Sequence, residues 1–196
     1  MMKPDIDIFV VTAFVSGDSK AFAIVYNAYA KVIFKRLLYL LKDENLAEEM
    51  LQNVFLKVWI NREGIDVSKN LYYYLIAIAN NLAVDSLRKG IRKQLLYEQM
   101  RFRAPVLSES VEDQYLHKED WEILKAAIAS LPPQRQVIFT KCKIEGKSYE
   151  EVSAELAIST STISNQLVLA MKSIRIFAAQ YTKEIKPLIL LFLLGN

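Results

Sequence analysis

Apolar residues recur every three to four positions along most of this chain, and this spacing constrains the fold more than any other feature. Alternating strand patterns are scarce, and five glycines and five prolines are too few for an all-β fold with many turns. The helical spacing fades between about residues 89 and 118, where polar residues are dense and Ala104-Pro105 interrupts any helix. We therefore predict an all-α protein with two small helical domains joined by a flexible linker, with limits 1–89, 90–118 and 119–196.

Four helices are expected in the first domain. Their predicted ranges are Ile6–Val15, Lys20–Leu41, Glu44–Ile60 and, after a loop, Lys69 to about Arg88. In the third helix, Trp59 extends the stripe of apolar residues and is expected in the core, whereas the polar side chains fall on the other side.

Composition excludes several classes of function. One cysteine (Cys142) and one histidine (His117) cannot form an internal disulfide or a structural zinc site. Cys142 is expected in the core and His117 in solvent. The N-terminal residues lack the pattern of a signal peptide, and the longest apolar run, Leu188–Leu194, is far short of the ~20 residues that span a bilayer. We expect a soluble cytoplasmic protein, and its net charge of +3 permits nucleic-acid binding without predicting it.

The strongest local signal lies between Ser148 and Arg175. Ser148 and Glu151 form a capping box that opens a short helix, Tyr149–Leu156, and a tight turn leads to a longer helix, Thr160–Ile176. Ile163, Leu167, Ala170 and Ile174 face inward on that helix. This is the pattern of a helix-turn-helix, whose second helix enters the major groove of DNA. The alternative is a helical hairpin with an ordinary Ser/Thr cap.

A second signal is the run Tyr72-Tyr73-Tyr74, which begins the helix that later carries basic and amide side chains. Aromatic side chains beside such groups can stack on unpaired bases and hold phosphates. Taken alone, this run is better explained by two tyrosines in the core and a solvated charged face.

The blocks AFAIVYNAYA, DENLAEEMLQNVFLKVW and YYYLIAIANNLAVDSLRK, followed by a linker and LPPQRQVIFTKCKIEGKSYEEVSAELAISTSTISNQLVLAMKSIR, occur in a specific order. In this order and spacing the chain resembles an extracytoplasmic-function (ECF) sigma factor of the sigma-70 superfamily from about Ala21 to Arg175. The resemblance implies a transcription initiation factor that binds core RNA polymerase and promoter DNA. Its first domain (region two) would melt and read the −10 element, and its second (region four) would read the −35 element.

The resemblance also implies roles for individual residues. The polymerase contacts would be Glu48, Glu49, Gln52 and Asn53; for some of these the alternative is a solvated acidic face. The loop Asn61–Asn70 would capture a flipped −10 base. The −10 residues would be Asn61, Arg62, Ser68, Asn80, Asn81, Asp85, Arg88 and Lys89. The −35 residues would be Ser159, Thr160, Ser161, Thr162, Ser164, Asn165, Gln166 and Lys172.

The recognition helix departs from the family pattern. Ser164, Gln166, Leu169 and Met171 stand where many members carry Lys or Arg, so only Lys172 and Arg175 remain as cations in its second half. Phosphate contacts supply much of the affinity for DNA. We therefore predict weak DNA binding by the second domain alone and stable promoter binding only with polymerase.

Several points stay open at this level. The apolar tail Ile185–Leu194 is expected either to pack as a terminal helix or to dock an inhibitor, and the family suggests a membrane-anchored anti-sigma factor as a partner. A stand-alone helix-turn-helix regulator is the main alternative function. Adjacent glutamates on a helix point about 100° apart, so neither Glu48-Glu49 nor Glu150-Glu151 predicts an active site. No cofactor, metal or small-molecule substrate is expected.

Overall fold

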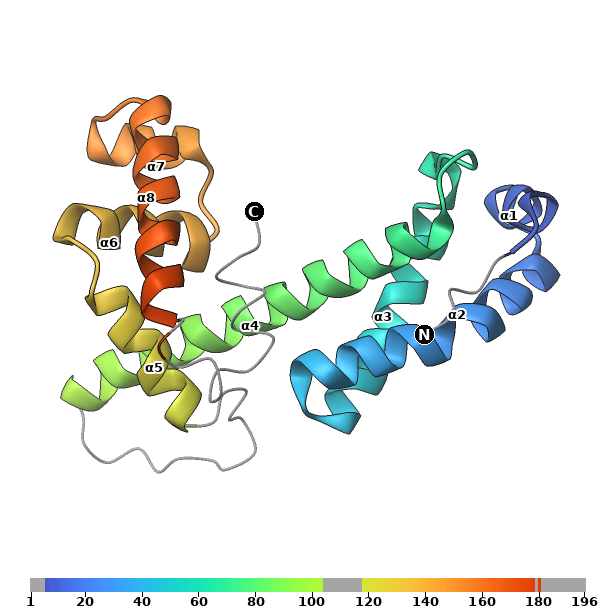
Figure 1. The fold of residues 1–196 in the computed structure, drawn as a ribbon, viewed down its shortest axis with the longest axis horizontal. Coiled ribbons are helices and arrows are strands. Elements are labelled where there is room, and N and C mark those ends of the chain that lie inside the picture. Colours follow the sequence, from blue (N-terminus) through green and yellow to red (C-terminus); the bar gives the residue numbers. More distant parts are fainter. Residues whose placement is uncertain (1–5, 104–117, 179, 181–196) are drawn as a thin grey trace. The chain divides into compact units, whose positions relative to one another are not determined.

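The computed structural model describes residues 6–103, 118–178 and 180, which are almost entirely helical and contain no β-strand. The described α-helices are α1 (Ile8–Val15), α2 (Ser19–Leu41), α3 (Glu44–Ile60), α4 (Leu71–Arg103), α5 (Lys118–Ala129), α6 (Pro133–Phe139), α7 (Tyr149–Leu156) and α8 (Thr160–Ala178) (Figure 1). A 3₁₀ turn, η1 (Arg62–Gly64), follows α3, and a π-helical turn, η3 (Thr140–Ile144), follows α6. The chain divides into two compact units, residues 1–83 and 84–196. The predicted all-α class with two helical domains is confirmed.

In unit 1, aspartates cap the N-termini of α2 and α3. Asp18 accepts hydrogen bonds from the backbone N–H groups of Lys20 (2.6 Å) and Ala21 (3.0 Å), and Asp43 accepts one from Leu46 N (2.9 Å). These bonds satisfy amides that the first turn of a helix leaves unpaired. The same bonds, Ala21 first, hold the pKa of Asp18 below its ordinary value. Gly17 stands between α1 and α2 with φ +93°, a conformation that favours glycine.

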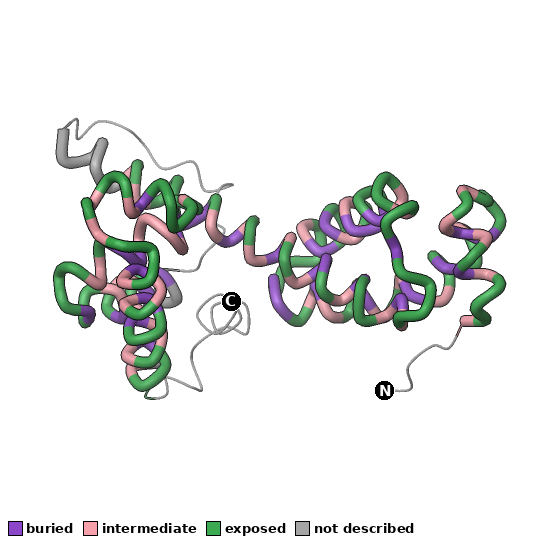
Figure 2. The backbone as a smooth tube through the Cα atoms, turned by 90° about the horizontal axis from the view of Figure 1, so that it is seen from above, coloured by how far each residue is buried: buried purple, intermediate pink, exposed green. Residues whose placement is uncertain are grey.

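The core of unit 1 follows the predicted spacing. In Figure 2 buried residues recur along each helix between exposed ones. The buried apolar positions of α2 and α3 are Ala21, Val25, Tyr29, Ile33, Leu37, Leu40, Leu41, Ala47, Met50, Val54, Phe55 and Val58. Aromatic rings join the helices: Phe14 of α1 contacts Trp59 of α3 with centroids 5.8 Å apart, and Phe22 of α2 contacts the same ring at 5.1 Å. Edge-on contacts of this kind stabilise more than their buried area alone.

Helix α4 is longer than predicted. It was expected to end near Arg88, but it continues to Arg103, so residues 90–103 of the predicted linker are helical. Its buried residues explain the continuation, because Leu75, Ala79, Ala83, Leu87 and Ile91 recur every four positions and all are buried. The domain limits 1–89, 90–118 and 119–196 stay predictions. Residues 104–117, with Ala104-Pro105 and His117, lie outside the described residues, as does the apolar tail Ile185–Leu194.

Unit 2 contains the predicted helix-turn-helix. Ser148 Oγ accepts from Glu151 N (3.1 Å), and the Glu151 carboxylate accepts from Ser148 N (2.7 Å), so the capping box is confirmed. After α7 the chain turns at Ala157, which has φ +52°, and Ser153 Oγ donates to Ile158 O (2.6 Å) across the turn. The four residues predicted to face inward on α8, Ile163, Leu167, Ala170 and Ile174, are all buried.

The π-helical turn η3 was not predicted; an ordinary helix was expected from Pro133 to about Ile144. Glu145 N donates to Thr140 O (2.9 Å), five residues back. Residues five apart share a face in a π-helix, which brings both Phe139 and Ile144 into the core. Cys142 lies in this turn and is half-buried, so the expected core position is only partly correct. Burial raises the pKa of its thiol.

Candidate functional site

An apolar groove lies between the N-terminal half of α2 and the C-terminal half of α3. Its volume is about 430 Å³, and it is lined by Ser19, Phe22, Tyr26, Gln52, Phe55, Leu56 and Trp59. Leu56 is 57% exposed, and the Tyr26 and Phe55 rings contact each other in a tilted arrangement with centroids 4.7 Å apart. Trp59, predicted in the core, is half-buried and lines the groove. Sequence spacing did not predict this groove.

The four predicted polymerase contacts lie on α3. Glu48, Glu49 and Gln52 are exposed, as their outward positions predicted, and Asn53 is half-buried. Gln52 also lines the apolar groove. Helix α3 thus exposes two carboxylates and an amide, and the amide of Gln52 borders the apolar groove.

A second cavity lies on the other flank of α3, against α4. Its volume is about 440 Å³, and it is lined by Lys57, Ile60, Asn61, Glu63, Gly64, Tyr74, Ile78 and Asn81. Asn61 Nδ2 donates to Lys57 O (2.8 Å), which fixes the amide at the end of α3. Of the predicted −10 residues, Asn61 and Asn81 come together here. Tyr74 joins them, and the tyrosine run was expected to place two of its members in the core. That expectation was wrong: Tyr72 is half-buried, and Tyr73 and Tyr74 are exposed.

The other predicted residues of the loop after α3 are engaged locally. The Arg62 guanidinium lies 4.8 Å from the centroid of the Trp59 ring, and its Nη1 donates to Trp59 O (3.0 Å). Ser68 Oγ donates to Asp66 Oδ1 (2.6 Å), which is the main reason that the pKa of Asp66 is lowered. Arg62 thus packs against the ring of Trp59, and Ser68 stays exposed on a turn.

The predicted −10 residues of α4 divide into two kinds. Asn80 Oδ1 accepts from Arg36 Nε of α2 (3.1 Å), and Arg88 Nη1 forms an ion pair with Asp85 (3.0 Å). Asn81 and Lys89 are exposed. Asn80, Asp85 and Arg88 thus bond to neighbouring side chains. Asn81 and Lys89 present their polar groups to solvent.

The predicted −35 residues lie at the N-cap and in the first two turns of α8, except Lys172, which lies further along the helix. Ser159 caps the helix: its Oγ accepts from Thr162 N (3.1 Å) and lies 2.8 Å from the hydroxyls of both Ser161 and Thr162. Gln166 Oε1 accepts from Arg135 Nε of α6 (2.9 Å). Thr160, Ser161, Asn165 and Lys172 are exposed, whereas Thr162, Ser164 and Gln166 are half-buried. Sequence reasoning omitted Val168 from this surface, although it is 66% exposed.

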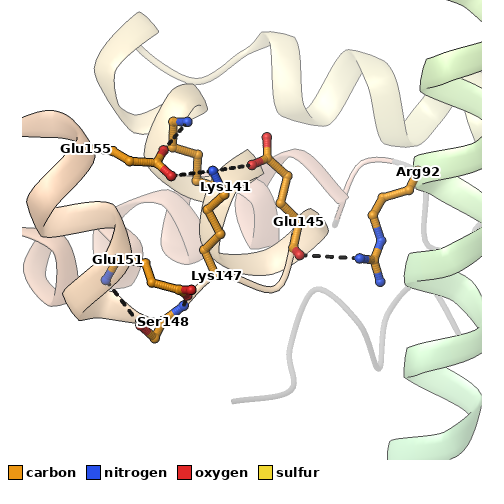
Figure 3. A network of polar contacts seen from close by, with 7 residues as sticks. All are labelled: Arg92, Lys141, Glu145, Lys147, Ser148, Glu151 and Glu155. Atoms are coloured by element: carbon orange, nitrogen blue, oxygen red, sulfur yellow. Dashed lines mark hydrogen bonds and ion pairs between the residues drawn. The ribbon is translucent and has the colours of Figure 1, made fainter.

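A network of ion pairs holds the start of the helix-turn-helix (Figure 3). Glu155 of α7 accepts from Lys141 of η3 (2.6 Å) and also from Lys147, which lies 3.3 Å from Glu145. These bonds, Lys141 first, lower the pKa of Glu155, and the bond to Glu155 raises the pKa of Lys147. Arg92 of α4 donates to Glu145 O (3.3 Å).

Within the described residues, no helix combines the length and the apolar character that a membrane crossing requires. The same residues contain no cluster of three or more side chains that could hold a metal ion.

Two parts of the chain match known protein families, and the chain is similar to known sigma factors. Residues 25–93 match the family described as sigma-70 region 2, and residues 121–174 match sigma-70, region 4. The chain is 29% identical over 152 residues to the ECF RNA polymerase sigma factor SigE of Mycolicibacterium smegmatis, covering 76% of this chain and 58% of SigE. It is 24% identical over 151 residues to ECF sigma factor SigM of Bacillus subtilis, covering 77% of this chain and 91% of SigM.

Among solved structures, a chain of an RsbN–BldN complex matches with a TM-score of 0.37 and 18% identity, covering 84% of this chain and 96% of that one. The region 2 and region 4 matches, in the order of the two units, assign the family. Its members are promoter-specific initiation factors and not enzymes. The chain belongs to the sigma-70 family, as a sigma factor of the ECF group.

Proposed function

We propose that this sigma factor binds core RNA polymerase through α3, takes an unstacked −10 base into the cavity between α3 and α4, and reads the −35 element with α8. The observation that carries the proposal is the pair of unlike cavities on the two flanks of α3. One is an apolar groove facing α2, and the other, which faces α4, is lined by two amides, a lysine, a glutamate and a tyrosine together with Ile60, Gly64 and Ile78. One helix thus offers a protein-binding surface and a nucleotide-sized site.

The polymerase surface combines the groove with the exposed polar residues beside it. Phe22, Tyr26 and Leu56 offer apolar area, which supplies most of the free energy of association when it is buried. Glu48 and Glu49 favour a basic partner surface, and Gln52 offers both a donor and an acceptor at the rim. Asn53, half-buried, would act at the edge of this surface.

The −10 site must offset the cost of unstacking a base, which is a few kcal/mol. Tyr74 offers a ring for stacking, and Asn61 and Asn81 offer amides for the base edge. Lys57 places a cation for a phosphate at the same cavity. Lys89 would contact the backbone, whereas Arg62, Ser68, Asn80, Asp85 and Arg88 would act mainly by positioning the loop and α4.

The −35 site is the exposed side of α8. The hydroxyls of Thr160 and Ser161 would meet phosphates at the start of the helix, and Asn165 would reach a base edge. Ser159, Thr162, Ser164 and Gln166 would support this surface, and Lys172 would contact a phosphate. The ion pairs of Glu155 would fix α7 and so the angle at which α8 is presented.

Run-off transcription with core RNA polymerase on a promoter library tests the proposal. We expect transcripts only when this chain is present, from promoters that share sequences near −10 and −35. No polymerase-dependent transcription, together with specific binding of the free chain to DNA, would favour the alternative of a stand-alone helix-turn-helix regulator. Co-purification with core polymerase separates the two in cells.

The free chain should bind promoter duplex weakly. Between Thr160 and Ala178 only Lys172 and Arg175 are basic, and few phosphate contacts give little salt-dependent affinity. We expect no specific gel shift by the chain alone and a clear shift with core polymerase. Tight specific binding of the free chain would contradict this.

We further propose a cytoplasmic protein without catalytic activity of its own, controlled by a membrane-anchored anti-sigma factor. Family membership supports this partner, because polymerase- and DNA-binding surfaces that act together can be silenced by one inhibitor. A pull-down from cells tests it. Absence of such a partner, with constitutive transcription from the selected promoters, would refute it.

A further inference from the structure

Two apolar side chains occupy the middle of the exposed side of α8. Val168 is 66% exposed and Leu169 is 41% exposed. Asn165 precedes them and Lys172 follows them at helical spacing, and both are exposed. The opposite side carries the buried residues Ile163, Leu167, Ala170 and Ile174. Val168 and Leu169 are therefore not core residues that happen to be incompletely covered.

The charge of α8 suits a nucleic-acid partner. The sequence Thr160–Ala178 contains no aspartate or glutamate, and its first turn carries hydroxyls. A surface without carboxylates, with Lys172 at one end, is compatible with phosphates on both sides of a groove.

The hydrogen-bonding groups of the predicted readers are partly engaged within the protein. Gln166 Oε1 accepts from Arg135 Nε (2.9 Å), which directs this side chain toward α6. The Ser159 hydroxyl is held by Thr162 N and by two neighbouring hydroxyls. Asn165 remains as the exposed amide next to Val168 and Leu169.

An exposed aliphatic pair on a base-reading helix has one apolar target in the major groove, the C5-methyl group of thymine. We propose that Val168 and Leu169 contact thymine methyl groups of the −35 element, so that this factor reads its promoter through methyl contacts beside one amide. This inference rests on the proposed function of α8. It names Val168 and Leu169 as specificity-determining residues.

Deoxyuridine tests the proposal, because it pairs as thymidine does but lacks the methyl group. Run-off transcription is measured with the full chain and core polymerase, on a selected promoter whose −35 thymines are replaced one at a time. We expect initiation to fall about fourfold for each contacted methyl, the factor that corresponds to burying one CH₂-sized group. Deoxyuridine in the spacer should have no effect.

Variants connect the methyl groups to these two residues. With the double variant Val168→Ala and Leu169→Ala, thymine and deoxyuridine promoters should give equal activity. The matched control is Ile176→Ala, another exposed apolar residue of α8 (60%), which should keep the full effect of deoxyuridine. Circular dichroism checks that each variant stays helical.

The outcomes separate this inference from the function on which it rests. If scrambling the −35 element has no effect on initiation, the proposed role of α8 fails. If scrambling abolishes initiation but deoxyuridine does not reduce it, only the methyl contacts are wrong. Selected −35 elements without thymine, or an unchanged deoxyuridine effect in the double variant, would also overturn the inference.

Discussion

Helices α3 and α8 are built alike on their buried sides and differ on their exposed sides. Each buries apolar residues at steps of three and four and begins at a polar cap, Asp43 for α3 and Ser159 for α8. The exposed side of α3 carries Glu48 and Glu49 next to an aromatic groove. That of α8 carries hydroxyls, an amide and two aliphatic side chains without a carboxylate.

This difference would separate the proposed polymerase surface from the proposed DNA surface in a chain whose net charge is only +3. Neither helix shows the basic stripe by which nucleic-acid binding is usually recognised. What distinguishes them is acidic charge: α8 has no acidic residue that would repel phosphates, whereas α3 presents three glutamates, Glu44, Glu48 and Glu49. The predictions below test this contrast, from the largest expected effect to the smallest.

Leu167→Ala should separate the core role of α8 from its exposed side. Leu167 is 3% exposed, and removing such a side chain costs about 2–5 kcal/mol of unfolding free energy. We expect unit 2 to be destabilised by this amount in chemical denaturation. The matched control, Leu169→Ala on the same helix, should change stability by less than about 0.5 kcal/mol. Similar losses for both variants would mean that the two sides of α8 are not distinct.

Glu48→Lys combined with Gln52→Ala should weaken polymerase binding at least about tenfold, because it reverses a charge and removes a polar contact at the groove. Fluorescence competition against the wild-type chain measures this. Glu122→Lys on α5, also an exposed glutamate, provides a control for charge and should bind normally. Equal weakening by the control would indicate a general charge effect rather than a surface on α3.

Tyr74→Ala should impair promoter melting about three- to tenfold if its ring stacks on an unpaired base. The measurement is 2-aminopurine fluorescence at −10 during open-complex formation by the holoenzyme. Tyr39→Ala, an exposed tyrosine of α2 outside both cavities, should melt the promoter at the wild-type rate. Normal melting by the Tyr74 variant would remove the tyrosine from the −10 site.

Glu155→Gln should have a small, pH-dependent effect on the stability of unit 2. The pKa of Glu155 in the folded chain is lowered from its ordinary value of 4.5, so its carboxylate stabilises the folded state fully above that value, and this contribution is lost as pH falls further through the lowered pKa. Wild type should therefore melt slightly above the variant at pH 7, and the difference should vanish once the pH lies below the lowered pKa of Glu155. A difference that persists in acid would show that the effect is not electrostatic.

Local signals predicted much of this fold. The range Glu44–Ile60 of α3 was correct because an aspartate cap, a regular apolar stripe and a polar break all agree there. The capping box of α7 and the four inward residues of α8 were predicted for the same reason. The site residues stay predictions, since the structure shows their exposure and neighbours but no partner.

The failures have two causes. The dense charges after Arg88 concealed Ile91, which continues the four-residue repeat of α4. The tyrosine run was assigned by hydrophobicity, although the neighbouring cavity, formed by residues distant in sequence, leaves Tyr74 exposed. The groove between α2 and α3 was missed for the same reason, because cavities depend on how two helices meet.

The π-helical turn η3 has a consequence for the evolution of this chain. A π-turn holds one residue more than an α-helical turn. Deleting one residue between Thr140 and Ile144 would restore regular helix and place Ile144 four positions after Phe139, on the same face of the helix. This turn should therefore tolerate the loss of one residue without moving either side chain out of the core.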